Sequence, residues 1–352
     1  MEYKHGGDIY RYPGMLDFSA NINPFGPSEA VIKAANAGVR EMAHYPDSRC
    51  GELRKALSGK LHLPEASIIV GNGAADLIFS LVLSEKPHKA VVTAPSFSEY
   101  TQALQAVDCE VIHYYLKESD QFDLKEDYLE LLTEDVDIIF LCSPGNPTGR
   151  VIERGLLEQI LKRCEICGIR MVLDECFYEF LEQPEEATMQ DFVREHPCLF
   201  LLRAFTKMHA MPGLRLGYGL CSEAHLLERM YQVRQPWSVS TVAQAAGLAA
   251  LGEEERVKAT RSYIAKERRW MEQELEKIGI RFIPSEANYI LFRSREDLFS
   301  LLLEKKILIR DCRNYEGLAP EYYRIAVRTH EDNEKLLGAL RESILDEPAH
   351  II

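Results

Sequence analysis

Three charged residues in this chain stand in an order that could hold one organic cofactor. Arg215 follows Lys207 by eight positions, and Asp174 precedes Lys207 by thirty-three. A lysine amine can form a Schiff base with an aldehyde, an arginine can bind a phosphate, and a carboxylate can keep a ring nitrogen protonated so that the ring accepts electrons. Pyridoxal 5'-phosphate has these requirements, so Lys207 and Asp174 are the candidate catalytic residues.

Further residues of suitable type could complete this cofactor site. Thr206 could bind the phosphate beside Arg215, Asn146 could donate to the ring oxygen, and Phe97 could stack on the ring face. Each also has an ordinary explanation, because an aspartate after a strand is commonly a turn residue, single charges are commonly solvated and phenylalanines commonly lie in the core. The prediction therefore depends on all of these residues meeting at one place.

The elements that would bring them together alternate between strands and helices. Short apolar runs, typical of strands buried on both faces, occur at Ser67–Val70, Ala90–Thr93, Asp137–Leu141, Ile169–Leu173 and Cys198–Leu202. Helical patterns such as Asp76–Ser84 and Leu156–Cys167 lie between them, which predicts an α/β fold with a mostly parallel sheet. The polar candidates follow the strands directly, so they should meet at the edge of the sheet where open α/β folds bind ligands.

The segment after the first of these runs, residues 71–76, has two interpretations. It resembles a dinucleotide-binding loop, but Asp76 stands where the third glycine is expected. It could be a plain tight turn with an acid stabilising the start of a helix. Alternatively, the backbone amides of Ala74 and Ala75 could bind one phosphate group at a helix N-terminus. We expect the second, because other phosphate ligands are present.

Composition narrows the classes of partner. The chain has 41 basic and 55 acidic residues and a formal charge of −14, whereas nucleic acids and anionic membranes select positive surfaces. It lacks both the roughly 18-residue apolar run of a membrane span and the apolar core of a signal peptide. Among its nine cysteines, Cys164 and Cys167 form a C-x-x-C pair, but no second cysteine pair or nearby histidine doublet completes a zinc site. We expect a cytoplasmic protein with free thiols and no metal, nucleic-acid or membrane site.

A chain of 352 residues favours two lobes. From residue 243 onward a long charged helical stretch precedes short strand patterns, which predicts a smaller C-terminal α+β domain over residues 243–352. Residues 41–242 would form the large cofactor-binding domain, and residues 1–40 an N-terminal arm that joins the small domain.

The chain resembles the fold-type I pyridoxal-phosphate enzymes of the class I/II aminotransferase superfamily over essentially its full length. The matching segments are residues 143–149, 174–175, 206–207 and 213–218. The resemblance implies a seven-stranded, mostly parallel sheet flanked by helices and a smaller α+β domain. It also implies a homodimer in which Tyr45 reaches the cofactor phosphate of the other subunit, and that Arg324 binds the substrate's α-carboxylate.

Within the superfamily the chain is similar to two kinds of enzyme, threonine-phosphate decarboxylases of cobalamin biosynthesis and histidinol-phosphate aminotransferases. The segments 5–7, 16–24 and 235–239, together with Phe177 where the aminotransferases have a tyrosine, resemble the decarboxylases more. We therefore expect decarboxylation of O-phospho-L-threonine to aminopropanol phosphate, with transamination of the histidinol-phosphate type as the alternative. A non-catalytic regulatory domain is a remote third possibility. Such domains normally carry a helix-turn-helix segment, and we expect neither terminus to have the room or the positive charge for one.

The substrate contacts are predicted from the same comparison. Arg328 replaces a glycine of the aminotransferases and adds a positive charge at the substrate end, and His5 and Asn21 belong to the arm. These three, with Asn146, are candidate ligands for a phosphate or carboxylate of a phosphorylated amino acid. The alternative is a surface histidine and an Arg328 paired to an acid.

Overall fold

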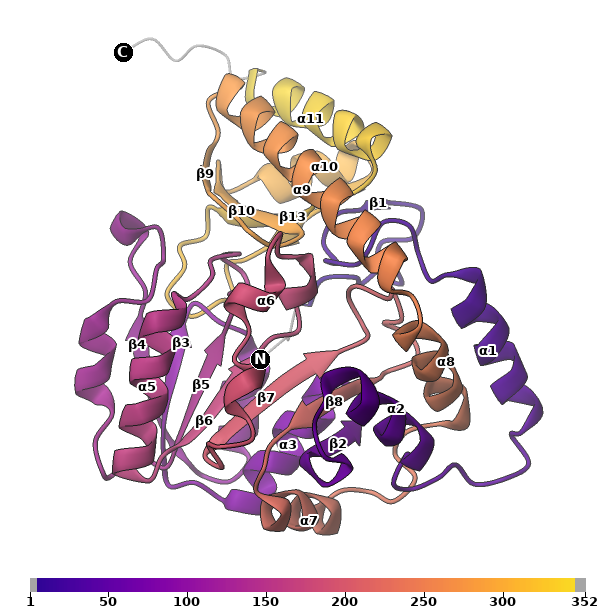
Figure 1. Ribbon diagram of the computed structural model, residues 1–352. Helices are drawn as coiled ribbons and strands as arrows, with labels where there is room; N and C mark the ends of the chain where they lie inside the picture. The colour runs from indigo at the N-terminus through magenta and orange to yellow at the C-terminus, as the bar shows by residue number, and fades with distance from the viewer. Residues whose placement is uncertain (1–4, 346–352) are drawn as a thin grey trace.

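The computed structural model describes residues 5–345 and contains three sheets (Figure 1). The largest has seven strands in the order β2, β8, β7, β6, β5, β3, β4. Their bounds are β2 Ile68–Gly71, β3 Lys89–Ala94, β4 Glu110–Tyr115, β5 Ile138–Cys142, β6 Arg170–Asp174, β7 Leu199–Ala204 and β8 Gly217–Leu220. All neighbours pair in parallel except β8, which runs antiparallel to β2 and β7. The α/β prediction with a mostly parallel seven-stranded sheet is confirmed.

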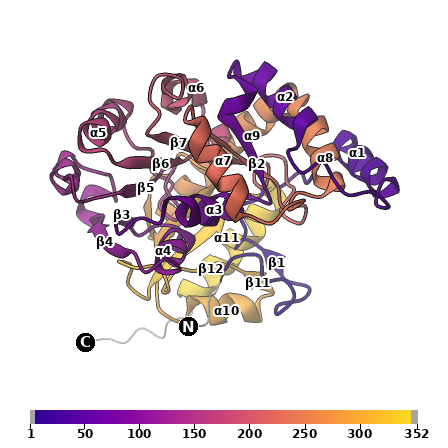
Figure 2. The same cartoon turned by 90° about the horizontal axis from the view of Figure 1, so that it is seen from below.

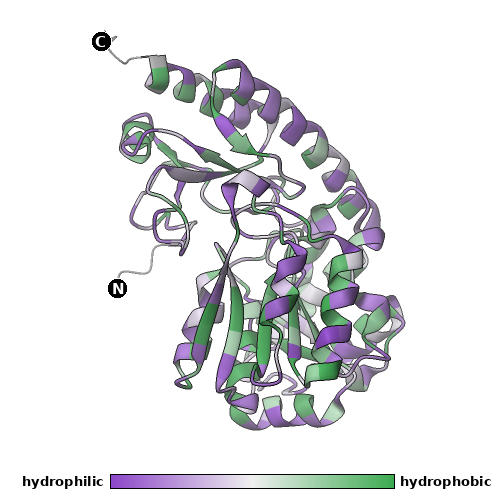
Figure 3. Ribbon diagram, turned by 90° about the vertical axis from the view of Figure 1, so that its left-hand side faces the viewer, coloured by the Kyte–Doolittle hydropathy of each residue, from purple (hydrophilic) through white to green (hydrophobic). Residues whose placement is uncertain are grey.

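Helices cover both faces of this sheet, which explains why its strands are apolar on both sides. One face packs against α2 (Gly51–Leu61), α5 (Arg154–Cys167) and α8 (Thr241–Leu251), through residues such as Leu57, Ile160 and Ala246. The other packs against α3 (Ala74–Glu85), α4 (Ser98–Gln105) and α7 (Ala224–Val233). In Figure 3 the strands between these helices are largely green, as expected for a three-layer core.

A second core lies over a small antiparallel sheet of order β12, β13, β10, β9. Its strands are β9 Arg281–Ile283, β10 Tyr289–Arg293, β12 Arg310–Asp311 and β13 Tyr322–Ala326. The helices of this region are α9 (Glu254–Lys277), α10 (Leu298–Glu304) and α11 (His330–Leu345), and Figure 1 places them above the large sheet. A single-turn helix, α6 (Pro184–Ala187), lies between the two regions.

The N-terminal segment contacts both regions. The short strand β1 (Leu16–Asp17) pairs in parallel with β11 (Ile307–Leu308), whereas α1 (Glu29–Arg40) packs on α8. At this crossing a Cβ on Gly38 would lie 2.9 Å from Cα of Val242, so the two helices require a glycine there. Figure 2 shows α1, α2 and α8 side by side. The domain boundaries at residues 40 and 242 stay a prediction.

Candidate active site

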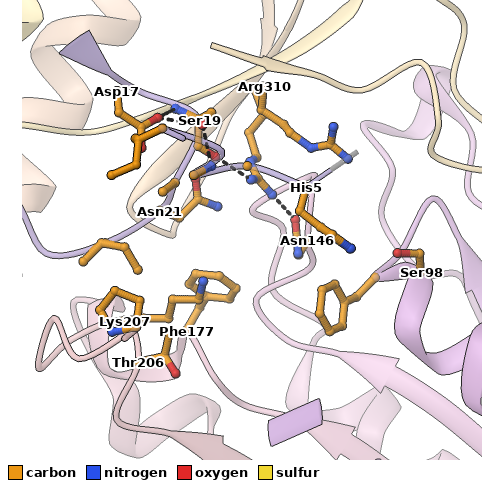
Figure 4. Close-up of a pocket in the computed structure, with 18 of the residues that line it drawn as sticks. His5, Asp17, Ser19, Asn21, Ser98, Asn146, Phe177, Thr206, Lys207 and Arg310 are labelled. Atoms are coloured by element: carbon orange, nitrogen blue, oxygen red, sulfur yellow. Dashed lines mark hydrogen bonds between the residues drawn. The ribbon is translucent and has the colours of Figure 1, made fainter. Parts of the chain in front are cut away.

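A cavity of about 410 Å³ lies at the carboxyl ends of the large sheet's strands, facing the small sheet (Figure 4). Six regions far apart in sequence line it, one of which is Phe177 after β6. The others supply His5, Asp17, Ser19 and Asn21 from the arm, Phe97 and Ser98 at α4, Asn146 after β5, Thr206, Lys207 and Arg215 after β7, and Arg310, Tyr315, Arg324 and Arg328 from the C-terminal region. Most of the predicted site residues therefore converge on one cavity.

Lys207 lies in the loop between β7 and β8, on the floor of the cavity. Its Nζ is 5.4 Å from the centroid of the Phe177 ring. Burial lowers the pKa of Lys207 to about 8, and the positive charges of Arg324 and Arg215 act in the same direction. A sizeable fraction of the amine is therefore neutral near physiological pH, as a nucleophilic lysine requires.

Asp174 is the last residue of β6 and is buried beneath the cavity. Its Oδ2 accepts a hydrogen bond from the Tyr100 hydroxyl at 2.6 Å, and its Oδ1 accepts one from the Cys176 amide at 2.8 Å. Burial raises the pKa of Asp174, while these hydrogen bonds and the nearby charge of Lys207 limit the rise. The sequence alone did not reveal Tyr100, because only the fold brings α4 to the end of β6.

Around the start of α3, the donors match what a phosphate needs. A Cβ on Gly73, whose φ is +85°, would lie 2.3 Å from Nη2 of Arg215, so the guanidinium packs directly on this glycine beside the Ala74 and Ala75 amides. The Asp76 carboxylate turns away, accepting from the Asn72 amide at 2.8 Å and from Arg234 at 3.0 Å. At the N-terminus of α3, backbone amides and the Arg215 guanidinium therefore lie close together. This geometry fits the predicted phosphate group.

Two buried arginines lie directly opposite each other above the cavity floor. Arg310 of β12 and Arg324 of β13 are partners in the antiparallel register, and their residues are only 6% and 5% exposed. Arg310 donates to the Asp311 carbonyl and to Asn314, while Arg324 donates to Asn146, Tyr315 and the Ser19 carbonyl. Within residues 5–345, neither forms a salt bridge with a carboxylate. Like charges facing each other on adjacent strands are unfavourable unless an anion lies between them.

Arg310 was missed by the sequence reasoning. Nothing in the sequence marks a single arginine in a short strand as a site residue. Arg310 stands out only because the strand register places it opposite Arg324. Arg328, which was predicted, lines the cavity but donates to Asp332 at 3.1 Å and to the Asp17 carbonyl at 3.0 Å. This is the acid-paired arrangement named above as the alternative.

The arm residues line the same cavity. Asn21 is buried, and its Oδ1 has no hydrogen-bond partner among the described residues. His5 lies 3.4 Å from Glu99, measured between Nε2 and Oε1.

Phe177 packs edge-on against Tyr289, with centroids 5.0 Å apart. Figure 4 shows Asp17, Ser19 and Asn21 across the cavity from Lys207 and Phe177.

Tyr45 lies outside this cavity. Its ring is exposed and stacks on Trp237, with centroids 4.5 Å apart and an interplanar angle of 26°. Within one chain it contacts none of the cavity residues named above, so its role across a dimer stays a prediction.

Residues 5–345 contain neither a candidate metal site nor a helix that could span a membrane. No three metal-binding side chains of the His, Cys, Asp or Glu type are grouped as an ion would need. None of the helices combines the length and the apolar character required to cross a bilayer.

The fold and cavity define an α/β protein with a lysine of lowered pKa near a buried aspartate. A model of the family "Aminotransferase class I and II" matches residues 13–340, and the chain belongs to this family. It is a pyridoxal-phosphate-dependent enzyme of the decarboxylase or aminotransferase kind.

Named relatives include both kinds. The chain is 40% identical over 331 residues to the threonine-phosphate decarboxylase of Salmonella typhimurium, covering 93% of this chain and 90% of the relative. It is 33% identical over 346 residues to the histidinol-phosphate aminotransferase of Symbiobacterium thermophilum, covering 96% and 93%. The solved histidinol-phosphate aminotransferase of Clostridium acetobutylicum superposes with a TM-score of 0.88 at 30% identity, covering 94% of this chain and 99% of that one.

Proposed function

We propose that this enzyme decarboxylates O-phospho-L-threonine to aminopropanol phosphate. The observation that carries the proposal is the facing pair Arg310 and Arg324, buried at the cavity without carboxylate partners among the described residues. Phosphothreonine carries two separate anionic groups, a carboxylate and a phosphate, and could engage both guanidiniums. Histidinol phosphate carries only the phosphate. The 40% identity to a threonine-phosphate decarboxylase points the same way.

The cofactor contacts follow from the geometry of the cavity floor. Pyridoxal phosphate, when bound, supplies an aldehyde that bonds to amines and a ring that withdraws electrons from the bond to be broken. Lys207 would provide the amine and Asp174 the charge facing the ring nitrogen. Arg215, Thr206 and the amides of Ala74 and Ala75 would hold the phosphate.

Two further residues would hold the cofactor ring. Phe97 would stack on the ring face from the start of α4. Asn146 accepts on Oδ1 from Arg324 and from the Tyr315 hydroxyl, the latter at 3.2 Å. Its amide nitrogen is therefore the atom suited to donate to the ring oxygen.

On the substrate side, Arg324 would bind the α-carboxylate, because its contacts to Asn146 place it nearest the cofactor contacts. Arg310 would bind the substrate phosphate, with Arg328, His5 and Asn21 lining the same space. Lys207, with a pKa of about 8, would return a proton to the substrate's Cα after carbon dioxide leaves. Phe177 brings no hydroxyl to the ring oxygen, which leaves Asn146 as the predicted donor there.

The active form would be a homodimer. Tyr45, whose ring is exposed and stacks on Trp237, would reach the cofactor phosphate of the second subunit. With the proposed reaction, the enzyme would be cytoplasmic and would act in cobalamin biosynthesis.

One enzyme preparation and two substrates test this proposal. The purified enzyme with pyridoxal phosphate is incubated with phosphothreonine alone, and separately with histidinol phosphate and a 2-oxo acid. The proposal predicts carbon dioxide release in the first reaction and only slow amino transfer in the second. Turnover that requires the 2-oxo acid would instead favour the aminotransferase.

A further inference from the structure

Asp174, beneath the predicted cofactor ring, receives a hydrogen bond from a residue of α4. The Tyr100 hydroxyl donates to Asp174 Oδ2 at 2.6 Å, and both residues are buried. On the other side, the Cys176 amide donates to Oδ1 at 2.8 Å. Each carboxylate oxygen thereby accepts one of these two hydrogen bonds, which restrain the rotation of the carboxylate.

The ring of Tyr100 is held by other aromatic side chains. It stacks on Phe140 with centroids 5.0 Å apart and an interplanar angle of 16°, and it meets Phe97 edge-on at 5.6 Å. The hydroxyl is therefore placed by a packed core and does not depend on Asp174 for its position. Burial is the largest of the causes that raise the pKa of Tyr100 well above 10, so the hydroxyl keeps its proton and acts as a donor.

We propose that Tyr100 is a positioning residue that holds Asp174 in the orientation and ionised state required by the ring nitrogen of the cofactor. This inference rests on the proposed function, because it presumes that Asp174 faces that nitrogen. A hydrogen bond donated to a carboxylate favours its charged form, and a buried carboxylate without such donors tends to take up a proton.

The Cys176 side chain also lowers the pKa of Asp174, so Tyr100 shares the neighbourhood of the carboxylate with other titratable groups. Lys207 faces it from the loop after β7, Cys176 follows it in sequence, Cys142 ends β5, and Tyr289 approaches from β10. Burial raises the pKa of both thiols, so they remain neutral. Lys207 would be bonded to the aldehyde when pyridoxal phosphate is bound, and so would not serve as a charged partner of the carboxylate. Among the described residues, Tyr100 is the hydroxyl that donates to the carboxylate, at 2.6 Å.

Tyr100→Phe tests the hydroxyl alone, because phenylalanine keeps both ring contacts. Tyr128→Phe is the matched control, since Tyr128 is equally buried but lies in a different core cluster, and its hydroxyl has no hydrogen-bond partner within residues 5–345. The probe is 4'-deoxypyridoxine phosphate, which lacks the aldehyde and so reports the ring and phosphate contacts without the bond to Lys207. Its dissociation constant is measured on apoprotein by equilibrium dialysis from pH 5.5 to 8.5, with the melting temperature of each apoprotein.

We expect Tyr100→Phe to weaken the probe about tenfold at neutral pH, the lower end of the range for a hydrogen bond to a charged group. Without the hydroxyl the pKa of Asp174 rises further, so the fall in affinity on acidification should begin about one pH unit higher than in the wild type. Tyr128→Phe should match the wild type in both respects. A Tyr100→Phe protein with unchanged affinity and pH profile would overturn the inference.

A double-mutant cycle separates action through Asp174 from action through packing. If Tyr100 works through Asp174, Tyr100→Phe should change the affinity less than about twofold when made in an Asp174→Asn background. A full tenfold effect in that background would overturn the inference in favour of packing through Phe97. Failure of the wild-type apoprotein to bind either the probe or pyridoxal phosphate would instead overturn the proposed function, and this inference with it.

Discussion

The buried ion pair between Glu175 and Arg203 gives a quantitative prediction on stability. Both side chains are only 2% exposed. Arg203 donates from Nε and Nη2 to Oε2 of Glu175 at 3.0 and 2.7 Å, and its guanidinium lies 4.0 Å from the centroid of the Tyr178 ring. Because Glu175 directly follows Asp174, the pair also holds the end of β6, where the aspartate lies, against β7.

Replacing Glu175 with glutamine keeps the shape of the side chain but leaves a buried guanidinium without a counter-ion. Gln190 and Thr188 remain as neutral acceptors, at 2.8 and 2.7 Å. Removing one partner of a buried pair costs about 3–5 kcal/mol. The control is Glu228→Gln, which breaks a bidentate pair with Arg49 at 2.8 and 2.7 Å on the surface. Both side chains of that pair are about half exposed, so its loss should cost about 0–1 kcal/mol.

Urea unfolding of the apoproteins at one fixed concentration measures both changes, so that any dimerisation affects them equally. We expect Glu175→Gln to lower the free energy of unfolding several times more than Glu228→Gln, without a change in the denaturant slope. Equal losses of under about 1 kcal/mol in the two variants would refute the reasoning, because burial would then add nothing to the value of the pair.

The remaining predictions concern the active site. Because the pKa of Lys207 is lowered to about 8, the fraction of Lys207 in the neutral amine form decreases as the pH drops below that value. Stopped-flow mixing of apoprotein with pyridoxal phosphate should show incorporation slowing about tenfold per pH unit below pH 8 and levelling above it, whereas a flat profile would contradict a titrating amine. Arg310→Gln should raise KM for phosphothreonine about tenfold to a hundredfold, with less change in kcat. Arg313→Gln, at an exposed arginine paired with Asp311, is the control, and an unchanged KM for Arg310→Gln would remove that residue from the phosphate site.

Much of the large sheet could be predicted from the sequence, because strands buried on both faces leave continuous apolar runs. Five such runs are β2, β3, β5, β6 and β7. Two strands lacked this signal. β4 is an edge strand with partly exposed residues such as His113, and β8 contains Gly217 and Gly219, whose missing side chains admit α3 and Phe200.

Some residues of the candidate site could likewise be predicted from the sequence, and others could not. Lys207, Asp174 and Arg215 lie directly after or near strand ends, so their convergence follows from the parallel order of the strands. Tyr100 and Arg310 could not be predicted, because their roles depend on contacts that only tertiary structure creates. Arg328 shows the opposite case, in which a suggestive charge is engaged with Asp332.

Release of the carboxyl carbon tests the central claim most directly. The enzyme with pyridoxal phosphate, and without any 2-oxo acid, is given phosphothreonine labelled with ¹³C in the carboxyl group, and labelled carbon dioxide is followed by mass spectrometry. A decarboxylase should release many equivalents per active site, with an equal amount of aminopropanol phosphate. Label that stays in the amino acid, or a release that stops at one equivalent per site, would contradict the account.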